Sequence, residues 1–326
     1  MTAVSNGQFS AADLGLRGMF ELRNAARWVA FPLILGSALL AALYLEPRLG
    51  APVALLLAQG GAGIVIIVSE HLLPFRRDWN RSHGDLVTDI CHAVVSGLGT
   101  TRLMRPLAIA FGVAAAAMLS RAWQGTIWPT EWHPLTQLAL ALVIAELPQY
   151  WLHRWQHERD WLWRFHTIHH SAPRLYWLNA ARFHPVDLSL LYLVGYIPLA
   201  FLGCPESTIM LFGLFDAVFG MLQHCNIDVR LGVLNRIFSM AEPHRWHHSL
   251  ELREANTNYG SNLIVWDLLF GTFFLPQPQD APAEIGISAL PRFPSGYGAQ
   301  LLAPFRWRHI QVEAGKGSDG RSSGRP

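Results

Sequence analysis

The sequence is poor in charged residues and almost free of lysine. Only 15% of its 326 residues are charged, against 51% hydrophobic residues, and Lys316 is the only lysine. Soluble domains usually carry about 25% charged residues. The composition therefore favours a membrane protein over two soluble domains. The net charge is only +2 and no basic block occurs, so nucleic acid is excluded as a partner.

Cysteine is equally scarce. Cys91, Cys204 and Cys225 form neither a CxxC pair nor an even-numbered framework, which argues against disulfides and thiolate zinc sites. A histidine-proline-glycine-glycine haem motif is missing, and Gly61 and Gly63 lack the third glycine of a dinucleotide-binding loop. We therefore expect that any electrons used in catalysis come from a separate protein.

Long apolar runs are what the chain has in abundance. A membrane helix requires about 20 apolar residues, and the N-terminus lacks the pattern of a cleaved signal peptide. The last two runs are joined by three residues only, which predicts an antiparallel hairpin that crosses the bilayer or enters it without crossing. The apolar runs occupy residues 28–45, 51–69, 106–120, 135–152, 188–203 and 207–223.

Arginines are distributed unevenly between alternate loops. They precede the first run, lie between the second and third, and follow the fourth, whereas the other loops hold only Arg48 and Arg121. By the positive-inside rule, the arginine-rich segments are cytoplasmic. The histidine-rich regions and both termini are then expected on the cytoplasmic side.

Histidines recur at helical spacing in three places. His153 and His157 are four residues apart, and two HxxHH motifs follow. Side chains three and four residues apart on a helix lie near one another, and neutral imidazole binds borderline metals well. One catalytic zinc uses about three protein ligands, so this number of histidines fits two metal ions better. The candidate ligands are His153, His157, His166, His169, His170, His184, His224, His244, His247 and His248.

The order of these motifs resembles the sterol desaturase / fatty acid hydroxylase superfamily of integral-membrane oxygenases. The resemblance runs from about Glu146 to Phe274 and rests on eight histidines in fixed order. It is carried by the segments HRWQH, FHTIHH, RFHP, QHCN, PHRWHHS, NTNYG and WDLLFGTFF.

The resemblance implies a histidine-bound pair of iron ions that activates dioxygen against a lipid C–H bond. It also implies an external electron donor, which would be a ferredoxin, a cytochrome or a reductase, and a location in a bacterial inner membrane. Zinc is an alternative metal, because imidazole suits both. Desaturation, carotenoid hydroxylation and lipid-ether cleavage remain alternative reactions. A membrane protein that stores or transports metal is the alternative from another class.

Other residues are candidates for supporting roles. Glu146 is an acid inside an apolar run, where acids are costly and usually partnered; it either supports a ligand imidazole or relays a proton, or it pairs with Arg154. His184 either ligates a metal or orients a ligand. Asn226, Asn258 and Asp267 stand at family positions that imply hydrogen bonds to ligands or loop closure, although turn chemistry explains Asn258 equally well.

The segment between the second and third apolar runs is polar. Its histidines, His71, His83 and His92, are not at HxxHH spacing, which favours ordinary structural or surface roles. The patterns ExxLPFRxxW and HGDLxTDxxH within it resemble an accessory motif of bacterial relatives. They suggest an element that supports or covers the site.

These observations together predict an all-α polytopic membrane protein. We expect four to six membrane helices and a cytoplasmic histidine-lined site for two metals. The predicted division is an N-terminal membrane anchor region at 1–134, a catalytic region at 135–276, and a C-terminal extension at 277–326 with a disordered tail from Gly315.

Overall fold

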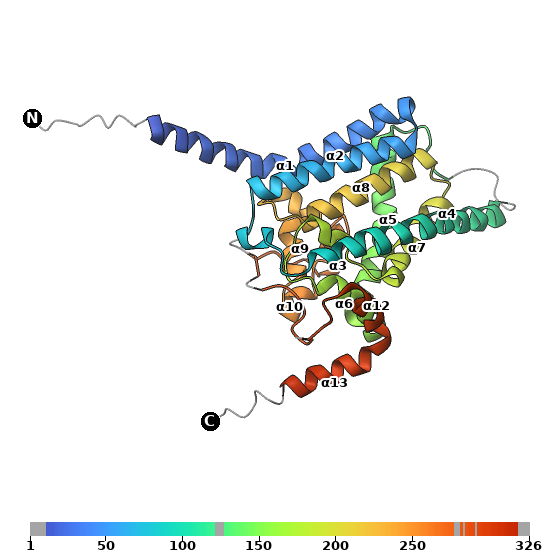
Figure 1. Ribbon diagram of the computed structural model, residues 1–326. Helices are drawn as coiled ribbons and strands as arrows, with labels where there is room; N and C mark the ends of the chain where they lie inside the picture. The colour runs from blue at the N-terminus through green and yellow to red at the C-terminus, as the bar shows by residue number, and fades with distance from the viewer. Residues whose placement is uncertain (1–10, 121–126, 277–280, 283, 291, 319–326) are drawn as a thin grey trace, which may run out of the picture.

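The computed structural model describes residues 11–120, 127–276, 281–282, 284–290 and 292–318. In these residues the chain is helical and forms no strand (Figure 1). The α-helices are α1 Ala11–Leu49, α2 Ala51–Leu72, α3 Leu86–Cys91, α4 Gly99–Ser120, α5 Pro134–Glu158, α6 Asp160–His170, α7 Pro185–Phe201, α8 Glu206–His224, α9 Ala241–His247, α10 Leu252–Ala255, α11 Val265–Phe270, α12 Tyr297–Leu302 and α13 Trp307–Ser318. The shorter helical turns are η1 Arg77–Asn80, η2 His92–Leu98, η3 Trp177–Ala181, η4 Gly232–Arg236 and η5 Ala303–Arg306.

Five helical segments are long and apolar enough to cross a membrane. They are Arg23–Leu49, Ala51–Leu72, Leu86–Met118, Pro134–Glu158 and Glu206–His224, and the apolar helix α7 is shorter. The expectation of an all-α membrane protein with four to six membrane helices is confirmed. The chain is an integral membrane protein.

The third span differs from its predicted position. It begins at Leu86 and joins α3, η2 and α4, whereas the apolar run alone predicted residues 106–120. The reason is that the polar side chains of this segment, such as Asp89, His92 and Ser96, are buried inside the protein. Leu86, Ile90, Val94 and Leu98, at four-residue intervals, are exposed, and so are Val87 and Val95.

The long helices form two neighbouring sets. Helices α1, α2 and α8 pack together, α4 packs along α7, and α5 lies between the sets in contact with α7 and α8 (Figure 1). Aromatic side chains fill the contact between α1 and α8: the ring of Phe219 stacks on Phe215 at 5.4 Å and meets the edge of Phe31 at 5.9 Å. This core fixes α8, whose last residue is His224.

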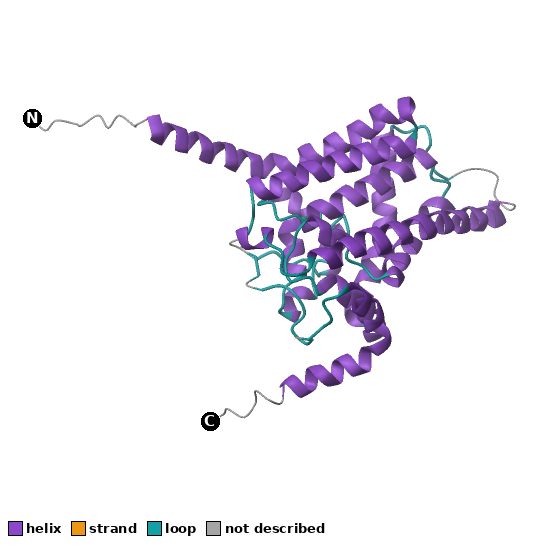
Figure 2. Ribbon diagram, viewed as in Figure 1, coloured by secondary structure: helices purple, strands orange, loops and turns teal. Residues whose placement is uncertain are grey.

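Short helices and loops gather at one end of the bundle (Figure 2). Helices α5 and α6 contact each other, as do α8 and α9.

Helix α13 continues to Ser318, into the tail that was expected to be disordered. Residues 319–326 of that tail lie outside the described part of the chain. The division at residues 134 and 276 stays a prediction.

Candidate metal centre

Five histidines from three helices converge in a first group. Their ligand atoms all lie within 4.8 Å of one another. Nε2 of His153 is 3.1 Å from Nε2 of His166. We call this set the five-histidine group; it comprises His153 and His157 of α5, His166 and His170 of α6, and His247 of α9.

Four further histidines converge beside it. Nε2 of His224 lies 3.2 Å from Nε2 of His169 and 3.1 Å from Nε2 of His244, and the latter is 3.0 Å from Nε2 of His248. These four residues, from α6, α8 and the end of α9, form the four-histidine group. The rings of His170 and His248 stack at 4.4 Å between centroids, so the two groups adjoin.

Each HxxHH motif serves both groups. In α6, His166 and His170 belong to the five-histidine group and His169 to the four-histidine group. In the last motif the assignment is reversed, because His244 and His248 share the four-histidine group while His247 joins the other. The pair four residues apart therefore always shares one group, and the histidine between them serves the neighbour.

The donor atoms fit metal ions. Two nitrogens on opposite sides of an ion at 2.0–2.1 Å lie about 4.2 Å apart, close to the spread within each group. Nε2 atoms of His157, His170 and His247 are buried without a hydrogen-bond partner in the described structure, which is costly unless a ligand satisfies them. Three unsatisfied nitrogens converging in one group support a bound cation.

Burial keeps five of the imidazoles neutral. It lowers the pKa of His169, His170 and His244 well below the usual value, and neighbouring imidazoles lower it further. The pKa values of His247 and His248 are lowered for the same two reasons. Neutral imidazole is the form that binds a metal, so these five histidines need no deprotonation before loading.

Several histidines of the five-histidine group have a fixed partner at Nδ1, the ring nitrogen that points away from the centre of the group. Nδ1 of His153 lies 2.7 Å from the carbonyl oxygen of Tyr259, and Nδ1 of His247 lies 2.7 Å from that of Thr257. Nδ1 of His166 lies 2.9 Å from a carboxylate oxygen of Asp187. Such contacts hold the proton on Nδ1 and direct Nε2 inward. Asp187 is not among the residues predicted from the sequence. The only sequence signal for it is its place two residues after the His-Pro pair.

Asp267 and Asn258 lie behind the histidines. Asp267 accepts hydrogen bonds from the backbone N–H groups of Tyr259 and Gly260, both at 2.8 Å. Asn258, at a positive φ of 55°, donates to the carbonyl oxygens of Pro243 and Phe274. Both side chains therefore close the loop whose Tyr259 carbonyl faces His153, and neither reaches the centre of a histidine group.

Glu146 and Asn226 also hold backbone and not imidazole. The carboxylate of Glu146 is fully buried and accepts from the backbone N–H of Asn262 at 2.9 Å. Asn226 donates to the carbonyl oxygen of Arg76 and to Asn80 Oδ1. The expected bond between Glu146 and a ligand imidazole is not among the contacts of the described residues.

His184 lies apart from both groups. Its Nδ1 accepts from the backbone N–H of Val186 at 3.0 Å, and its Nε2 is 3.3 Å from the carbonyl oxygen of Leu301. The imidazole thus caps the start of α7 and has no nitrogen directed at the other histidines. The two roles expected for His184, ligating a metal or orienting a ligand, stay predictions, while these contacts support a third role as the cap of α7.

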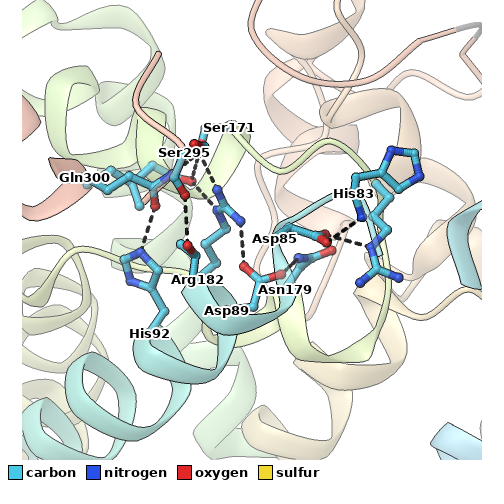
Figure 3. Close-up of polar contacts among 12 residues, drawn as sticks. His83, Asp85, Asp89, His92, Ser171, Asn179, Arg182, Ser295 and Gln300 are labelled. Carbon is cyan, nitrogen blue, oxygen red and sulfur yellow. Dashed lines mark hydrogen bonds and ion pairs between the residues drawn. The ribbon is translucent and has the colours of Figure 1, made fainter. Parts of the chain in front are cut away.

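A buried ionic network supports the loop after α6. The guanidinium of Arg182 contacts Asp89 at 2.6 Å, and it also donates to the carbonyl oxygen of Ile168 and to Ser171 Oγ (Figure 3). His92 lies 2.9 Å from Gln300 Oε1 in the same view. The polar segment between the second and third runs therefore holds the end of the α6 motif in place, and His92 has the structural role that its spacing favoured.

A cavity of about 700 Å³ adjoins both histidine groups. Its lining includes His153 and His166 of the five-histidine group and three members of the four-histidine group. Its wall includes Leu86, Ile90 and Val94, which are also exposed on the outer face of α3 and η2. An apolar molecule that enters along this face would reach the histidines.

Comparisons with known proteins agree with the motifs. The fatty acid hydroxylase family model matches residues 138–272. The chain is 40% identical over 243 residues to the ornithine lipid hydroxylase OlsE of Rhizobium tropici, covering 74% of this chain and 72% of that protein. It is 34% identical over 134 residues to the alkylglycerol monooxygenase of Danio rerio, covering 41% of this chain and 30% of that protein.

A more distant relative is the sphinganine C4-monooxygenase 1 of Arabidopsis thaliana, which is 26% identical over 159 residues, 48% of this chain and 60% of that protein. No solved structure matches the chain. The extent of the match to the ornithine lipid hydroxylase, together with the family model, identifies the chain as a member of the fatty acid hydroxylase superfamily.

Proposed function

We propose that this protein is a membrane oxygenase that uses two iron ions, one in each histidine group, to hydroxylate a lipid. The observation that carries the proposal is the convergence of nine histidines, five of which line a lipid-sized cavity. Iron held there would supply the activation of dioxygen. The hydroxylase and monooxygenase names of the relatives support this reaction over desaturation.

The chain's own residues have three tasks in this reaction. The nine histidines hold the metals, and Asp187 and the carbonyl oxygens of Tyr259 and Thr257 keep three of the rings oriented. The apolar cavity excludes water, and it aligns a chain against the histidines. The exposed apolar face of α3 and η2 admits the substrate from the bilayer.

An amino-acid lipid is the first substrate to test, since the relative covering most of this chain is named an ornithine lipid hydroxylase. Alkylglycerols are the second, because the alkylglycerol monooxygenases match the catalytic region, although the chain spans only 30% of the length of such a relative.

Hydroxylation with dioxygen consumes two electrons and two protons for each oxygen atom inserted, and releases water. The sequence contains neither the haem motif nor the dinucleotide loop described above, so the electrons would come from a ferredoxin, a cytochrome or a reductase. The arginine distribution supports a cytoplasmic position for the histidine groups, on the side of a bacterial inner membrane where such donors are found.

The competing function is storage or transport of a metal such as zinc. Transport favours polar residues distributed along the spans, whereas here the histidines gather in two adjoining groups and several have fixed outer partners.

Reconstitution decides between the oxygenase and the transport function. Protein loaded with ferrous iron and supplied with a chemical reductant and air should add one oxygen atom to an ornithine lipid or an alkylglycerol, as read by mass spectrometry. Zinc-loaded and anaerobic samples are the controls. Movement of zinc across vesicles without lipid oxidation would support transport instead.

A further inference from the structure

We propose that Arg105 and Tyr196 form a polar subsite deep in the lipid cavity, which binds an oxygen acceptor of the lipid, either a carboxylate or an ester or amide carbonyl. The subsite would fix which carbon of the lipid reaches the histidine groups. This inference rests on the proposed function, because it concerns recognition of the same substrate. Both residues line the cavity, beside Gly213 of α8, which lies eleven residues before His224 on that helix.

Arg105 lies inside the third candidate membrane span, Leu86–Met118. A charged side chain at that depth is costly and usually faces a cavity or a partner. Its Nη2 donates to the carbonyl oxygen of Ile209 at 3.2 Å, and its guanidinium lies 5.1 Å from the ring centre of Tyr196. Among the described residues no carboxylate oxygen lies within salt-bridge distance of Arg105, although the carboxylate of Asp216 interacts with it electrostatically from farther away. A guanidinium has five N–H donors. Most of these donors remain available to a ligand.

Two glycines make room for polar groups in the cavity wall. A Cβ added at Gly213 of α8 would lie 2.9 Å from Nη2 of Arg105 and 3.0 Å from the hydroxyl oxygen of Tyr196. A Cβ at Gly195 of α7 would lie 2.8 Å from Nε2 of Gln149. Gln149 is only 5% exposed and also lines the cavity. The backbone therefore approaches closely where these polar side chains meet the cavity.

The chemistry of the subsite favours an acceptor. Arg105 and the hydroxyl of Tyr196 both offer donors. The nearby carboxylate of Asp216 accepts a hydrogen bond from Asn262 Nδ2 at 3.1 Å. It does not lie within salt-bridge distance of Arg105. A carboxylate or carbonyl oxygen would use the donors of Arg105, and such charge-assisted bonds are the stronger ones.

The position of the subsite sets the distance between the bound oxygen acceptor and the histidine groups. Gly213 precedes His224 by eleven residues of α8, which corresponds to about 16 Å along the helix at 1.5 Å per residue. A lipid anchored beside Gly213 would therefore present to the metals a carbon about that far along its chain. The regiochemistry of oxidation would then depend on Arg105.

Binding to metal-free full-length protein in detergent tests the subsite independently of oxidation. Wild type should bind palmitate more tightly than hexadecane, and Arg105→Gln should lower the palmitate affinity about tenfold or more while leaving hexadecane unchanged. Tyr196→Phe, which keeps the ring, should show a smaller loss of the same kind. Arg102→Gln, an exposed position on the same helix, is the matched control. Methyl palmitate shows whether a carbonyl suffices or a carboxylate is required.

Equal binding of palmitate and hexadecane to wild type, or unchanged palmitate affinity in both Arg105→Gln and Tyr196→Phe, would overturn the subsite. In an active reconstituted system, Arg105→Gln should also spread the inserted oxygen over several carbons where wild type uses one. If wild type oxidises no lipid, the proposed function fails, and the binding measurements still decide the subsite.

Discussion

The imidazole of His166 and the carboxylate of Asp187 form a buried pair, with Nδ1 and Oδ2 2.9 Å apart. The contact joins α6, which carries an HxxHH motif, to the first turn of α7. Because Nδ1 is held by the carboxylate, Nε2 is the nitrogen that faces the five-histidine group. A residue outside the histidine motifs thus fixes the orientation of a proposed ligand.

Replacing Asp187 by asparagine should weaken metal binding. The side chain keeps its size but loses its charge, and the loss of such an outer partner costs about 10- to 100-fold in metal affinity or activity. Competition with a chelator, followed by metal analysis, measures the effect. Glu158→Gln is the control, since Glu158 pairs with Arg154 near the surface. An unchanged affinity in Asp187→Asn would remove Asp187 from the account.

His184 and His170 should respond differently to substitution. His170→Ala removes a buried nitrogen that converges with four others, so the protein should lose metal and activity. His184→Asn should keep its metal, because asparagine also caps helices well, and His184→Ala should lower the free energy of unfolding by about 1 kcal/mol. Metal analysis and thermal melting separate the two. Loss of metal in His184→Asn would establish His184 as a ligand.

Asp267 and Glu146 both accept hydrogen bonds from backbone, but only Asp267 holds a residue, Tyr259, whose carbonyl oxygen contacts a histidine of the groups. Asp267→Asn should loosen the loop at Tyr259 and lower metal affinity at the five-histidine group, through His153. Glu146→Gln should lower stability by about 1 kcal/mol and leave metal content unchanged, because Asn262 is its backbone partner. Chelator titration of both variants checks the pair. A metal-poor Glu146→Gln protein would assign that carboxylate to the site after all.

The orientation in the membrane is testable by labelling. Single cysteines introduced at Asp160 and at Glu131, both exposed, lie near the histidine groups and on the preceding loop, respectively. A membrane-impermeant maleimide applied to intact cells should label only the cysteine at 131 if the histidines are cytoplasmic. Labelling at 160 from outside would reverse the topology.

The histidine spacing indicated eight of the nine histidines that the structure brings together, all but His224, but not how each motif divides between the two groups. At 3.6 residues per turn, a side chain four positions along a helix is rotated by about 40° from the starting one, and a side chain three positions along by about 60° in the opposite direction. His166 and His170 can therefore share a group while His169 turns to the other. Sequence alone places all three near one face and cannot say where the second group lies.

Supporting residues were harder to predict, for a related reason. Tyr259 and Thr257 act through their carbonyl oxygens, so their side chains carry no signal. Asp89 and His92 made their segment appear too polar to enter the membrane, yet they are buried against Arg182 and Gln300. Such partners come from distant parts of the chain, and periodicity reports only on one helix at a time.

The number of metal atoms per chain tests the central claim most directly. Full-length protein loaded anaerobically with ferrous iron and freed of excess metal should contain close to two iron atoms per chain by elemental analysis. His244→Ala, which disrupts only the four-histidine group, should retain close to one. A wild-type protein that binds a single metal atom, with nine histidines intact, would contradict the two-metal account.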